Sequence, residues 1–263
     1  MSDGPWGIGQ FSLAGKVAIV SGGAGLYGRH ISQALASVGA HVAIAARTVQ
    51  ACQEAATELV DAGLAASAHA LDLRSQESIT TLRDEVVRTY GTIDILVNNA
   101  VARGGGDMAH TTADQWAASS EVNSLGLFLM SQACGEQMIA QHSGVIINIA
   151  SIYGMVGPDF SIYGNTGMTN PAFYAYDKGG MINFTRYLAA FYGPHGIRAN
   201  CLSPGGLFSG QPDEFVTNYQ SKALLGRLAG PEDIKGPIVF LASAASEYVT
   251  GANIPVDGGW TAV

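Results

Sequence analysis

Residues 17–35 read "VAIVSGGAGLYGRHISQAL", an apolar strand pattern that passes through a glycine-rich turn into a helical pattern. In that turn, Gly22, Gly25 and Gly28 allow a tight bend, a close approach of backbone N–H groups to a pyrophosphate, and close packing of the helix start on the strand. The same spacing also occurs in turns that are merely tight. Because these glycines follow a strand and open a helix, they predict a dinucleotide-binding turn.

The rest of the chain repeats this alternation of apolar and amphipathic runs. The apolar runs predict strands at 16–21, 41–46, 66–73, 93–100, 144–151, 197–204 and 251–259. The amphipathic runs predict helices near 26–38, 49–62, 75–90, 112–141, 174–193 and 213–226, with threonine N-caps in "TVQACQ" (48–53) and "TTADQW" (111–116). One more helix is expected to open at Gly230, with Pro231 at its first position.

These elements define a fold class. Runs such as "VIINI" are apolar without alternation, which is typical of parallel strands covered on both faces by helices. We therefore expect an α/β protein with a single-domain Rossmann fold over 1–263, in which helices flank a doubly wound parallel β-sheet.

Composition and charge exclude several classes of protein. The 263 residues are 48% hydrophobic, which is enough for one domain with a large core. The formal net charge is −8 and no basic run occurs, which argues against nucleic-acid and anionic-membrane partners. The first residues lack a basic-then-apolar signal, and no apolar run reaches the roughly 18 residues of a membrane span, so we expect a cytoplasmic protein. Cys52, Cys134 and Cys201 are widely spaced, and no Cys/His spacing resembles a metal site. We expect buried, unreactive thiols and no metal.

The end of the second strand indicates which dinucleotide binds. A carboxylate at this place holds the adenosine ribose hydroxyls and repels a 2′-phosphate. Here Ala45 and Ala46 provide no carboxylate and Arg47 can pair with a phosphate, so NADP is favoured over NAD. If Arg47 is only a solvated arginine that stacks on adenine, NAD stays possible. Asp72, at the end of the third strand, can receive the adenine amino group or cap the following helix.

Tyr174 and Lys178 in "NPAFYAYDKGG" (170–180) stand four residues apart, so on a helix they share one face. A free tyrosine has a pKa of about 10, and a neighbouring ammonium lowers it. Such a phenol can take a proton from a substrate hydroxyl while hydride leaves the adjacent carbon, or donate it in reverse. Tyr176 points to another face and is expected to pack. The alternative for Tyr174 is an aromatic–aliphatic helix pair.

With these features in view, the whole chain resembles the short-chain dehydrogenase/reductase family, of the compact single-domain kind. The family's catalytic tyrosine and lysine fall on Tyr174 and Lys178, its serine after the fifth strand on Ser151 in "INIASIYG", and its helical asparagine on Asn123 in "EVNSLGLF". The resemblance implies a proton relay in which the serine polarises the substrate oxygen and the asparagine amide fixes a water near the lysine. Taken alone, Ser151 or Asn123 could equally be a cap or turn residue.

Further landmarks of the family are "NNA" (98–100) and "PG" (204–205), the latter followed by a loop like the one that reaches the nicotinamide carboxamide. The resemblance implies cofactor contacts from Ser21, Gly22, Gly25, Leu26, Tyr27, Gly28, Arg47, Asp72, Leu73, Asn99, Ala100, Tyr174, Lys178, Pro204, Gly205, Leu207 and Ser209. Two features depart from the family pattern. The glycine spacing is nearer to that of the family's larger two-domain branch, and Val101 stands where glycine is usual.

The chain between Ser151 and Tyr174 is longer than in the family and carries an insertion at about 154–173. Because both ends of it carry catalytic groups, we expect the insertion beside the substrate, together with a segment at about 205–228. The expected substrate contacts are Arg103, Tyr153, Tyr163 and Asn165, whose hydrogen-bonding groups suggest a sugar, aldonate or polyol more than a lipid. The alternative is that the insertion packs on itself or on a neighbouring subunit.

We therefore expect an NAD(P)-dependent oxidoreductase that interconverts a secondary alcohol and a ketone on a sugar, aldonate or polyol-like substrate. One alternative is a 3-oxoacyl thioester reductase, although an acidic carrier protein favours a basic docking surface. Another is a catalytically silent NAD(P)-binding regulatory protein. The family's helices at 112–141 and 174–193 imply a homo-oligomer, dimer or tetramer. Met181, Phe184, Leu188 and Phe191 form a candidate contact stripe, with core packing as the alternative.

Overall fold

The strands form one parallel sheet in the computed structural model, which describes residues 8–263. This seven-stranded sheet has the order β3-β2-β1-β4-β5-β6-β7, and all neighbouring strands are parallel. The strands are β1 (Val17–Ser21), β2 (His41–Ala46), β3 (Ala66–Ala70), β4 (Ile95–Asn98), β5 (Gly144–Ile149), β6 (Ile197–Pro204) and β7 (Asn253–Val256). The order reverses between β1 and β4, and ligands of such sheets bind outside the carboxyl ends of the strands at this point. The predicted Rossmann fold is confirmed.

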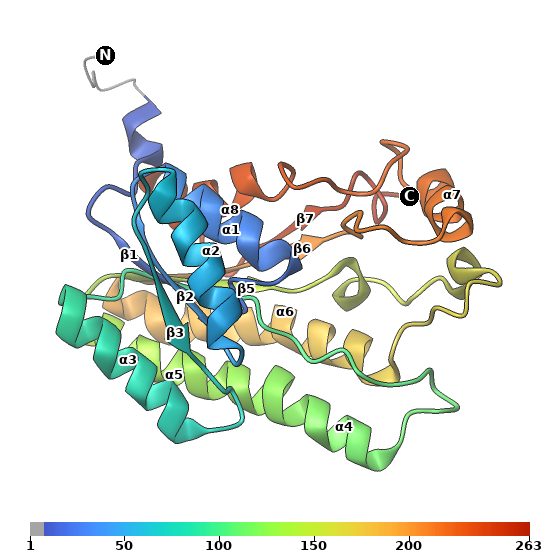
Figure 1. Cartoon of the computed structure of the whole chain (residues 1–263), viewed down its shortest axis with the longest axis horizontal. Coiled ribbons are helices and arrows are strands. Elements are labelled where there is room, and N and C mark those ends of the chain that lie inside the picture. Colours follow the sequence, from blue (N-terminus) through green and yellow to red (C-terminus); the bar gives the residue numbers. More distant parts are fainter. Residues whose placement is uncertain (1–7) are drawn as a thin grey trace.

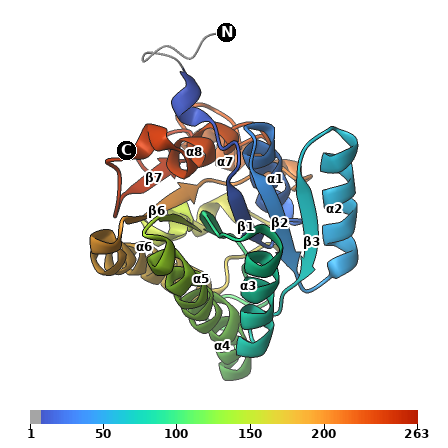
Figure 2. The same cartoon turned by 90° about the vertical axis from the view of Figure 1, so that its left-hand side faces the viewer.

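Helices cover both faces of this sheet (Figures 1 and 2). The α-helices are α1 (Leu26–Ser37), α2 (Val49–Asp61), α3 (Gln76–Tyr90), α4 (Ala113–Ser120), α5 (Leu127–Gln141), α6 (Ala172–Tyr192), α7 (Asp213–Lys222) and α8 (Lys235–Ala242). Short 3-10 helices are η1 (Ile8–Phe11), η3 (Ile152–Gly154), η4 (Phe160–Tyr163), η5 (Gly193–His195) and η6 (Ala244–Ser246), whereas η2 (Glu121–Gly126) is π-helical. Figure 2 shows α1, α2 and α8 on one face and α3, α5 and α6 on the other.

The core is an apolar layer on each face of the sheet. In β1, Ala18 and Val20 pack in the layer that contains α1 and α8, while Val17 and Ile19 pack in the layer that contains α3 and α5. Successive side chains of a strand point to opposite faces, so a strand covered on both sides needs an apolar residue at every position. This explains the apolar runs without alternation. The predicted burial of Cys52, Cys134 and Cys201 is also confirmed.

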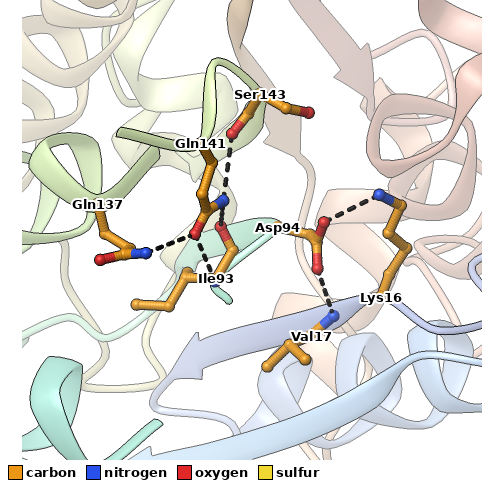
Figure 3. Close-up of polar contacts among 7 residues, drawn as sticks. All are labelled: Lys16, Val17, Ile93, Asp94, Gln137, Gln141 and Ser143. Atoms are coloured by element: carbon orange, nitrogen blue, oxygen red, sulfur yellow. Dashed lines mark hydrogen bonds and ion pairs between the residues drawn. The ribbon is translucent and has the colours of Figure 1, made fainter. Parts of the chain in front are cut away.

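A polar network ties the amino ends of β1 and β4 to α5 (Figure 3). The carboxylate of Asp94 accepts hydrogen bonds from the ammonium of Lys16 and from the backbone N–H of Val17, both at 2.9 Å. The amide of Gln141 pairs with both backbone groups of Ile93, accepting from its N–H at 3.0 Å and donating to its carbonyl at 2.9 Å. These contacts set the relative positions of the two strands between which the sheet order reverses, and they leave the carboxyl edge free for a ligand.

The helix predicted at 112–141 is interrupted. It begins as expected at Thr112, whose side chain forms a capping box with Gln115. Between α4 and α5, however, Glu121–Gly126 forms a π-helical turn. Such a turn inserts one residue without changing the apolar periodicity much, so the sequence pattern did not predict it, and π-turns are frequent at functional sites.

The last helix begins later than predicted. Residues 231–234 form turns, and α8 starts at Lys235 rather than at Pro231. Pro237 explains the difference, because it has no N–H to donate to the carbonyl of Asp233 and its ring crowds that carbonyl.

The predicted contact stripe on α6 divides into two parts. Met181 and Leu188 are buried in the core, which is the alternative stated above, whereas Phe191 is 54% exposed. Phe191 stacks on Tyr187, with ring centroids 6.2 Å apart. Tyr176 is 67% exposed and its ring lies beside that of Trp116, so its predicted packing role is confined to the surface.

The insertion packs within this chain on the segment that follows β6. Ile162 and Tyr163 from the insertion share an apolar cluster with Phe215 and Tyr219 of α7 and with Trp260. A salt bridge of 2.9 Å between Lys222 and Asp159 joins the two segments at the surface. In Figure 1 the yellow insertion accordingly lies beside α7. The two segments expected on the substrate side are therefore one packed unit.

Candidate active site

Tyr174 and Lys178 lie on the inner face of α6, and both are buried, with 6% and 3% of their surface exposed. The Lys178 ammonium lies 5.7 Å from the centroid of the Tyr174 ring and donates a hydrogen bond of 2.6 Å to the carbonyl of Ile149, the last residue of β5. The predicted pairing of the two side chains on one helical face is thus present. The carbonyl of Ile149 holds the ammonium at the carboxyl end of the sheet.

A second cation touches the tyrosine. The guanidinium of Arg103, from the loop after β4, donates through Nη2 to the Tyr174 hydroxyl at 2.8 Å, and its central carbon lies 4.9 Å from the ring centroid. Burial by itself would raise the pKa of Tyr174, but the charges of Lys178 and Arg103 and hydrogen bonds from Ser151 and Arg103 lower it below the ordinary value. Burial lowers the pKa of Lys178, an effect that a phenolate at Tyr174 opposes. The two cations therefore make the phenolate form of Tyr174 easier to reach than in a free tyrosine.

Ser151 directly follows Ala150 at the end of β5 and is buried. It caps η3, since its hydroxyl accepts the backbone N–H of Tyr153 at 3.2 Å. The predicted cap role and a position beside Tyr174 are therefore both present in one residue.

Asn123 lies in the π-helical turn, and its amide is fully engaged with protein groups. Its oxygen accepts the backbone N–H of Ala102 at 2.8 Å, and its nitrogen lies 3.0 Å from the Ala102 carbonyl and 2.8 Å from the carboxylate of Asp177. That this residue fixes a water near Lys178 stays a prediction. The amide clamps the backbone of the loop that carries Arg103.

The expected substrate residues are only partly brought together. The hydroxyls of Tyr153 and Tyr163 lie 3.4 Å apart, and burial raises the pKa of both phenols, so both remain neutral hydrogen-bonding groups. Asn165 differs: its side chain is exposed, and its backbone N–H donates to the carboxylate of Glu214 on α7 at 3.1 Å. The structure thus gives Asn165 a part in holding the insertion on α7.

In the glycine turn, backbone segments approach one another too closely for side chains at Gly22 and Gly28. Gly22 has φ = 64°, and a Cβ there would lie 2.9 Å from Cα of Ala100, while a Cβ on Gly28 would overlap the carbonyl oxygen of Gly22. The side-chain amide of Asn99 donates to the carbonyls of Ser21 and Gly22 at 3.1 and 3.0 Å. The "NNA" segment after β4 therefore braces the turn after β1, across the point where the strand order reverses.

An open recess lies between this turn and the loop after β6. It is lined on one side by Ala24, Gly25 and Leu26 and on the other by Leu207, Phe208 and Ser209, with Arg29 and His30 beneath. Among residues 8–263 no side chain caps the N-terminus of α1, so its first N–H groups are available to an anion. Such a cradle fits the pyrophosphate of a dinucleotide. Tyr27 spans the two sides, since its hydroxyl donates to the carbonyl of Gly205 at 2.9 Å.

Three charged side chains lie near the carboxyl ends of β2 and β3, where the adenosine part of the cofactor is expected. Arg47 is exposed at the end of β2. Asp72 is paired with Arg74, whose hydrogen bonds hold the pKa of that carboxyl at about 2. Ser75 rather than Asp72 caps α3, so the capping alternative for Asp72 is wrong. Leu73 is buried at the same edge.

The sequence reasoning missed Asp177, a buried carboxylate directly before Lys178. Its position was visible as the one acidic residue of the tyrosine helix. No group of three His, Cys, Asp or Glu side chains suited to a metal occurs in the part of the chain that the structure describes. In the same residues, no helix has the length and apolar character needed to cross a membrane.

This geometry agrees with comparisons to known proteins. A family model described as Enoyl-(Acyl carrier protein) reductase matches residues 25–261, and the chain belongs to the short-chain dehydrogenase/reductase family. It is therefore an NAD(P)-dependent oxidoreductase that acts on CH–OH groups.

Three relatives illustrate the range of the family around this chain. The 2-dehydro-3-deoxy-D-gluconate 5-dehydrogenase of Escherichia coli K12 is 35% identical, covering 97% of this chain and 99% of its own. A 3-oxoacyl-[acyl-carrier-protein] reductase of Aquifex aeolicus is 32% identical, covering 95% of this chain and 99% of its own. The solved structure of a gluconate 5-dehydrogenase from Burkholderia cenocepacia, in complex with NADP and tartrate, is 30% identical with a TM-score of 0.88, covering 97% and 98% of the two chains.

Proposed function

We propose that this enzyme interconverts a secondary alcohol and a ketone on an aldonate or related sugar acid or polyol, with Tyr174 as the general acid/base. The observation that carries the proposal is the presence of two cations beside Tyr174. The Arg103 guanidinium donates to its hydroxyl at 2.8 Å, and the Lys178 ammonium lies 5.7 Å from its ring centroid. One cation serves to stabilise a phenolate, and the second provides a partner for an anionic group of the substrate.

In the oxidative direction, the phenolate oxygen of Tyr174 takes the proton of the substrate hydroxyl. A nicotinamide cofactor held by the glycine turn and residues 204–209 would supply the acceptor for the hydride of the adjacent carbon. Lys178 stabilises the phenolate, and Ser151 hydrogen-bonds the reacting oxygen, which develops carbonyl character as the proton leaves. In the reductive direction the same phenol returns its proton to the alkoxide. Asn123 contributes by holding the Arg103 loop in place.

The substrate class follows from the groups that face Tyr174. Arg103 is exposed in its loop, so its guanidinium can reach a carboxylate in two parallel hydrogen bonds. The neutral hydroxyls of Tyr153 and Tyr163 suit substrate hydroxyl groups, which a lipid chain would leave unpaired. The names of the relatives above, which include two enzymes of gluconate-type substrates, support the same class.

NADP is the preferred cofactor in this proposal. Ala45 and Ala46 place no carboxylate at the end of β2, and Arg47 is exposed there to receive a 2′-phosphate. Asp72 does not cancel this charge because Arg74 neutralises it. The glycine turn, the N-terminus of α1 and residues 204–209 would hold the rest of the dinucleotide.

A homo-oligomer, dimer or tetramer, is also proposed. Tyr187 and Phe191 are 62% and 54% exposed on α6 and stack on each other, an arrangement suited to contact with a second copy. Light scattering at micromolar concentration tests this, and a monomer there would remove the proposal.

A 3-oxoacyl thioester reductase is the alternative that a specific observation favours, because a relative of that name is 32% identical. The deciding experiment follows reduced nicotinamide while NADP and NAD are offered with gluconate and other aldonates, polyols, and a 3-oxoacyl thioester. The proposal predicts turnover of aldonates or polyols that disappears in Tyr174→Phe. Turnover of the thioester alone would overturn the substrate class, and tight cofactor binding without any turnover would favour a regulatory protein.

A further inference from the structure

Asp177 is a buried carboxylate whose hydrogen bonds lead toward the catalytic tyrosine. Its side chain is on α6, one residue before Lys178, with 6% of the residue exposed. It accepts hydrogen bonds from the hydroxyl of Ser119 at 2.9 Å and the amide of Asn123 at 2.8 Å, and a weaker one from Ser124 at 3.4 Å. Buried carboxylates are costly unless donors surround them, so this one fixes the orientation of those donors.

Asn123 passes this orientation to the loop after β4. Because Asp177 and Ser119 attract the amide nitrogen, the amide oxygen of Asn123 points toward the backbone N–H of Ala102. The amide nitrogen also lies 3.0 Å from the Ala102 carbonyl. Both backbone groups of Ala102 are thereby fixed by a single side chain.

Ala102 directly precedes Arg103, whose guanidinium donates to Tyr174 at 2.8 Å. Arg103 is exposed, so little packing fixes its side chain, and its position depends on the backbone of the loop. Asn123 holds that backbone at Ala102. A continuous series of contacts therefore runs from Asp177 through Asn123 and Ala102 to Arg103. It returns to α6 at Tyr174, which is three residues before Asp177 in the sequence.

We infer that Asp177 is a positioning residue that holds the second cation, Arg103, on the hydroxyl of Tyr174 through Asn123 and the backbone of Ala102. The inference rests on the proposed function, in which Tyr174 exchanges a proton with the substrate. It deepens that function, because it assigns the orientation of Arg103, and with it recognition of an anionic substrate group, to a carboxylate that touches neither substrate nor cofactor.

Asp177 could influence Tyr174 through Arg103 or through Lys178, and the groups that face Tyr174 allow the two effects to be separated. Lys178 faces it from α6 and Arg103 from the loop after β4. The Ser151 hydroxyl contributes to lowering its pKa, and the neutral phenols of Tyr27 and Tyr163 lie near. Asp177 also favours the charged form of Lys178. A substitution at Asp177 could therefore act through either cation, and the Arg103→Met background distinguishes the two.

The test compares Asp177→Asn with Ser124→Ala, which removes a hydrogen bond to the same carboxylate without touching Asn123. Ionisation of Tyr174 is followed as the tyrosinate absorbance that each protein shows in excess of its own Tyr174→Phe derivative, with no need for turnover. For Asp177→Asn we expect the titration to move to higher pH and kcat for alcohol oxidation at neutral pH to fall roughly 3- to 30-fold, as for residues coupled in one network. Ser124→Ala should leave both near wild type. In an Arg103→Met background, Asp177→Asn should add little.

Two results would overturn the inference. One is an unshifted titration of Tyr174 in a folded Asp177→Asn protein. The other is an equal shift of that titration in the Arg103→Met background, which would mean that Asp177 acts through Lys178. If Asp177→Asn does not fold, Ala102→Pro tests the same series from the loop by removing the N–H that Asn123 accepts. A folded Ala102→Pro protein with an unshifted titration would equally overturn it. Because the titration is read without substrate, failure of the proposed substrate class would not be mistaken for failure of this inference.

Discussion

Arg103 and Tyr174 are 71 positions apart in the chain, yet the guanidinium of one donates to the hydroxyl of the other at 2.8 Å. The Lys178 ammonium lies 5.7 Å from the centroid of the same ring, so the phenol has two cations as neighbours. In the proposed function, this relationship supplies both a proton acceptor and a site for an anion. The predictions below test its parts.

Tyr174→Phe removes the proton acceptor while the ring continues to fill its place. We expect kcat to fall by about 10²- to 10⁴-fold, the usual contribution of general acid/base catalysis. Binding of the reduced cofactor, followed by fluorescence, should change little. Tyr176→Phe is the matched control, because Tyr176 is on the same helix but 67% exposed, and its activity should stay near wild type. Full activity in Tyr174→Phe would contradict the assigned role.

The rate of alcohol oxidation should rise with pH through the pKa of Tyr174, because the phenolate is the required form and is lost as the pH falls. Arg103 helps to lower this pKa, so in Arg103→Met the rise should occur at higher pH, and in Arg103→Lys at a pH between the two. The measurement is the pH profile of kcat for oxidation. A shift to lower pH in Arg103→Met would reverse the assigned sign of the interaction.

Arg103 should also discriminate between substrates. If its guanidinium pairs with a carboxylate, Arg103→Gln should lower kcat/KM for an aldonate roughly 10- to 100-fold more than for the uncharged polyol of the same length, the scale of a lost charge-assisted pair. The two substrates are compared on one enzyme preparation, so damage to the fold affects both. Equal losses would show that Arg103 acts on Tyr174 alone.

Arg47 should set the cofactor preference. Arg47→Ala is expected to weaken NADP binding about 10-fold or more with little change for NAD, since only NADP carries the 2′-phosphate. Ala46→Asp should change the ratio of dissociation constants further toward NAD, because it restores a carboxylate at the end of β2. Isothermal titration with both cofactors measures the ratio. An unchanged ratio in both variants would place the adenosine end elsewhere.

Gly28→Ala should destabilise the protein by roughly 1–3 kcal/mol, the cost of an added methyl group in a packed site, because the new Cβ would overlap the carbonyl of Gly22. Gly236→Ala is the matched control: Gly236 is also in a helix, and a Cβ there meets nothing within 4 Å. That change should stabilise the protein by about 0.5–1 kcal/mol. Thermal unfolding of both variants checks the prediction, and a Gly28→Ala protein as stable as wild type would refute the packing argument.

Much of the fold could be predicted from local patterns. The apolar runs of β1 and β5 and the glycine turn predict a parallel sheet with a dinucleotide groove, because residues covered on both faces must be apolar throughout and only glycine permits φ = 64° at Gly22 without strain. The spacing of Tyr174 and Lys178 likewise follows from the pitch of a helix. These features depend on residues close in sequence, so the sequence by itself determined them.

The rest was decided by contacts between distant segments. The π-helical turn at Asn123, the engagement of its amide by Ala102, and the buried Asp177 leave the apolar periodicity almost unchanged, so local patterns could not reveal them. Packing of the insertion on α7, and the hydrogen bond of the Asn165 backbone N–H to Glu214, depend on partners some 50 residues away. The sequence therefore determined which chemistry this protein carries, whereas only the tertiary structure decided that Arg103 lies on Tyr174, because hydrogen bonds between distant segments are formed when the chain has folded.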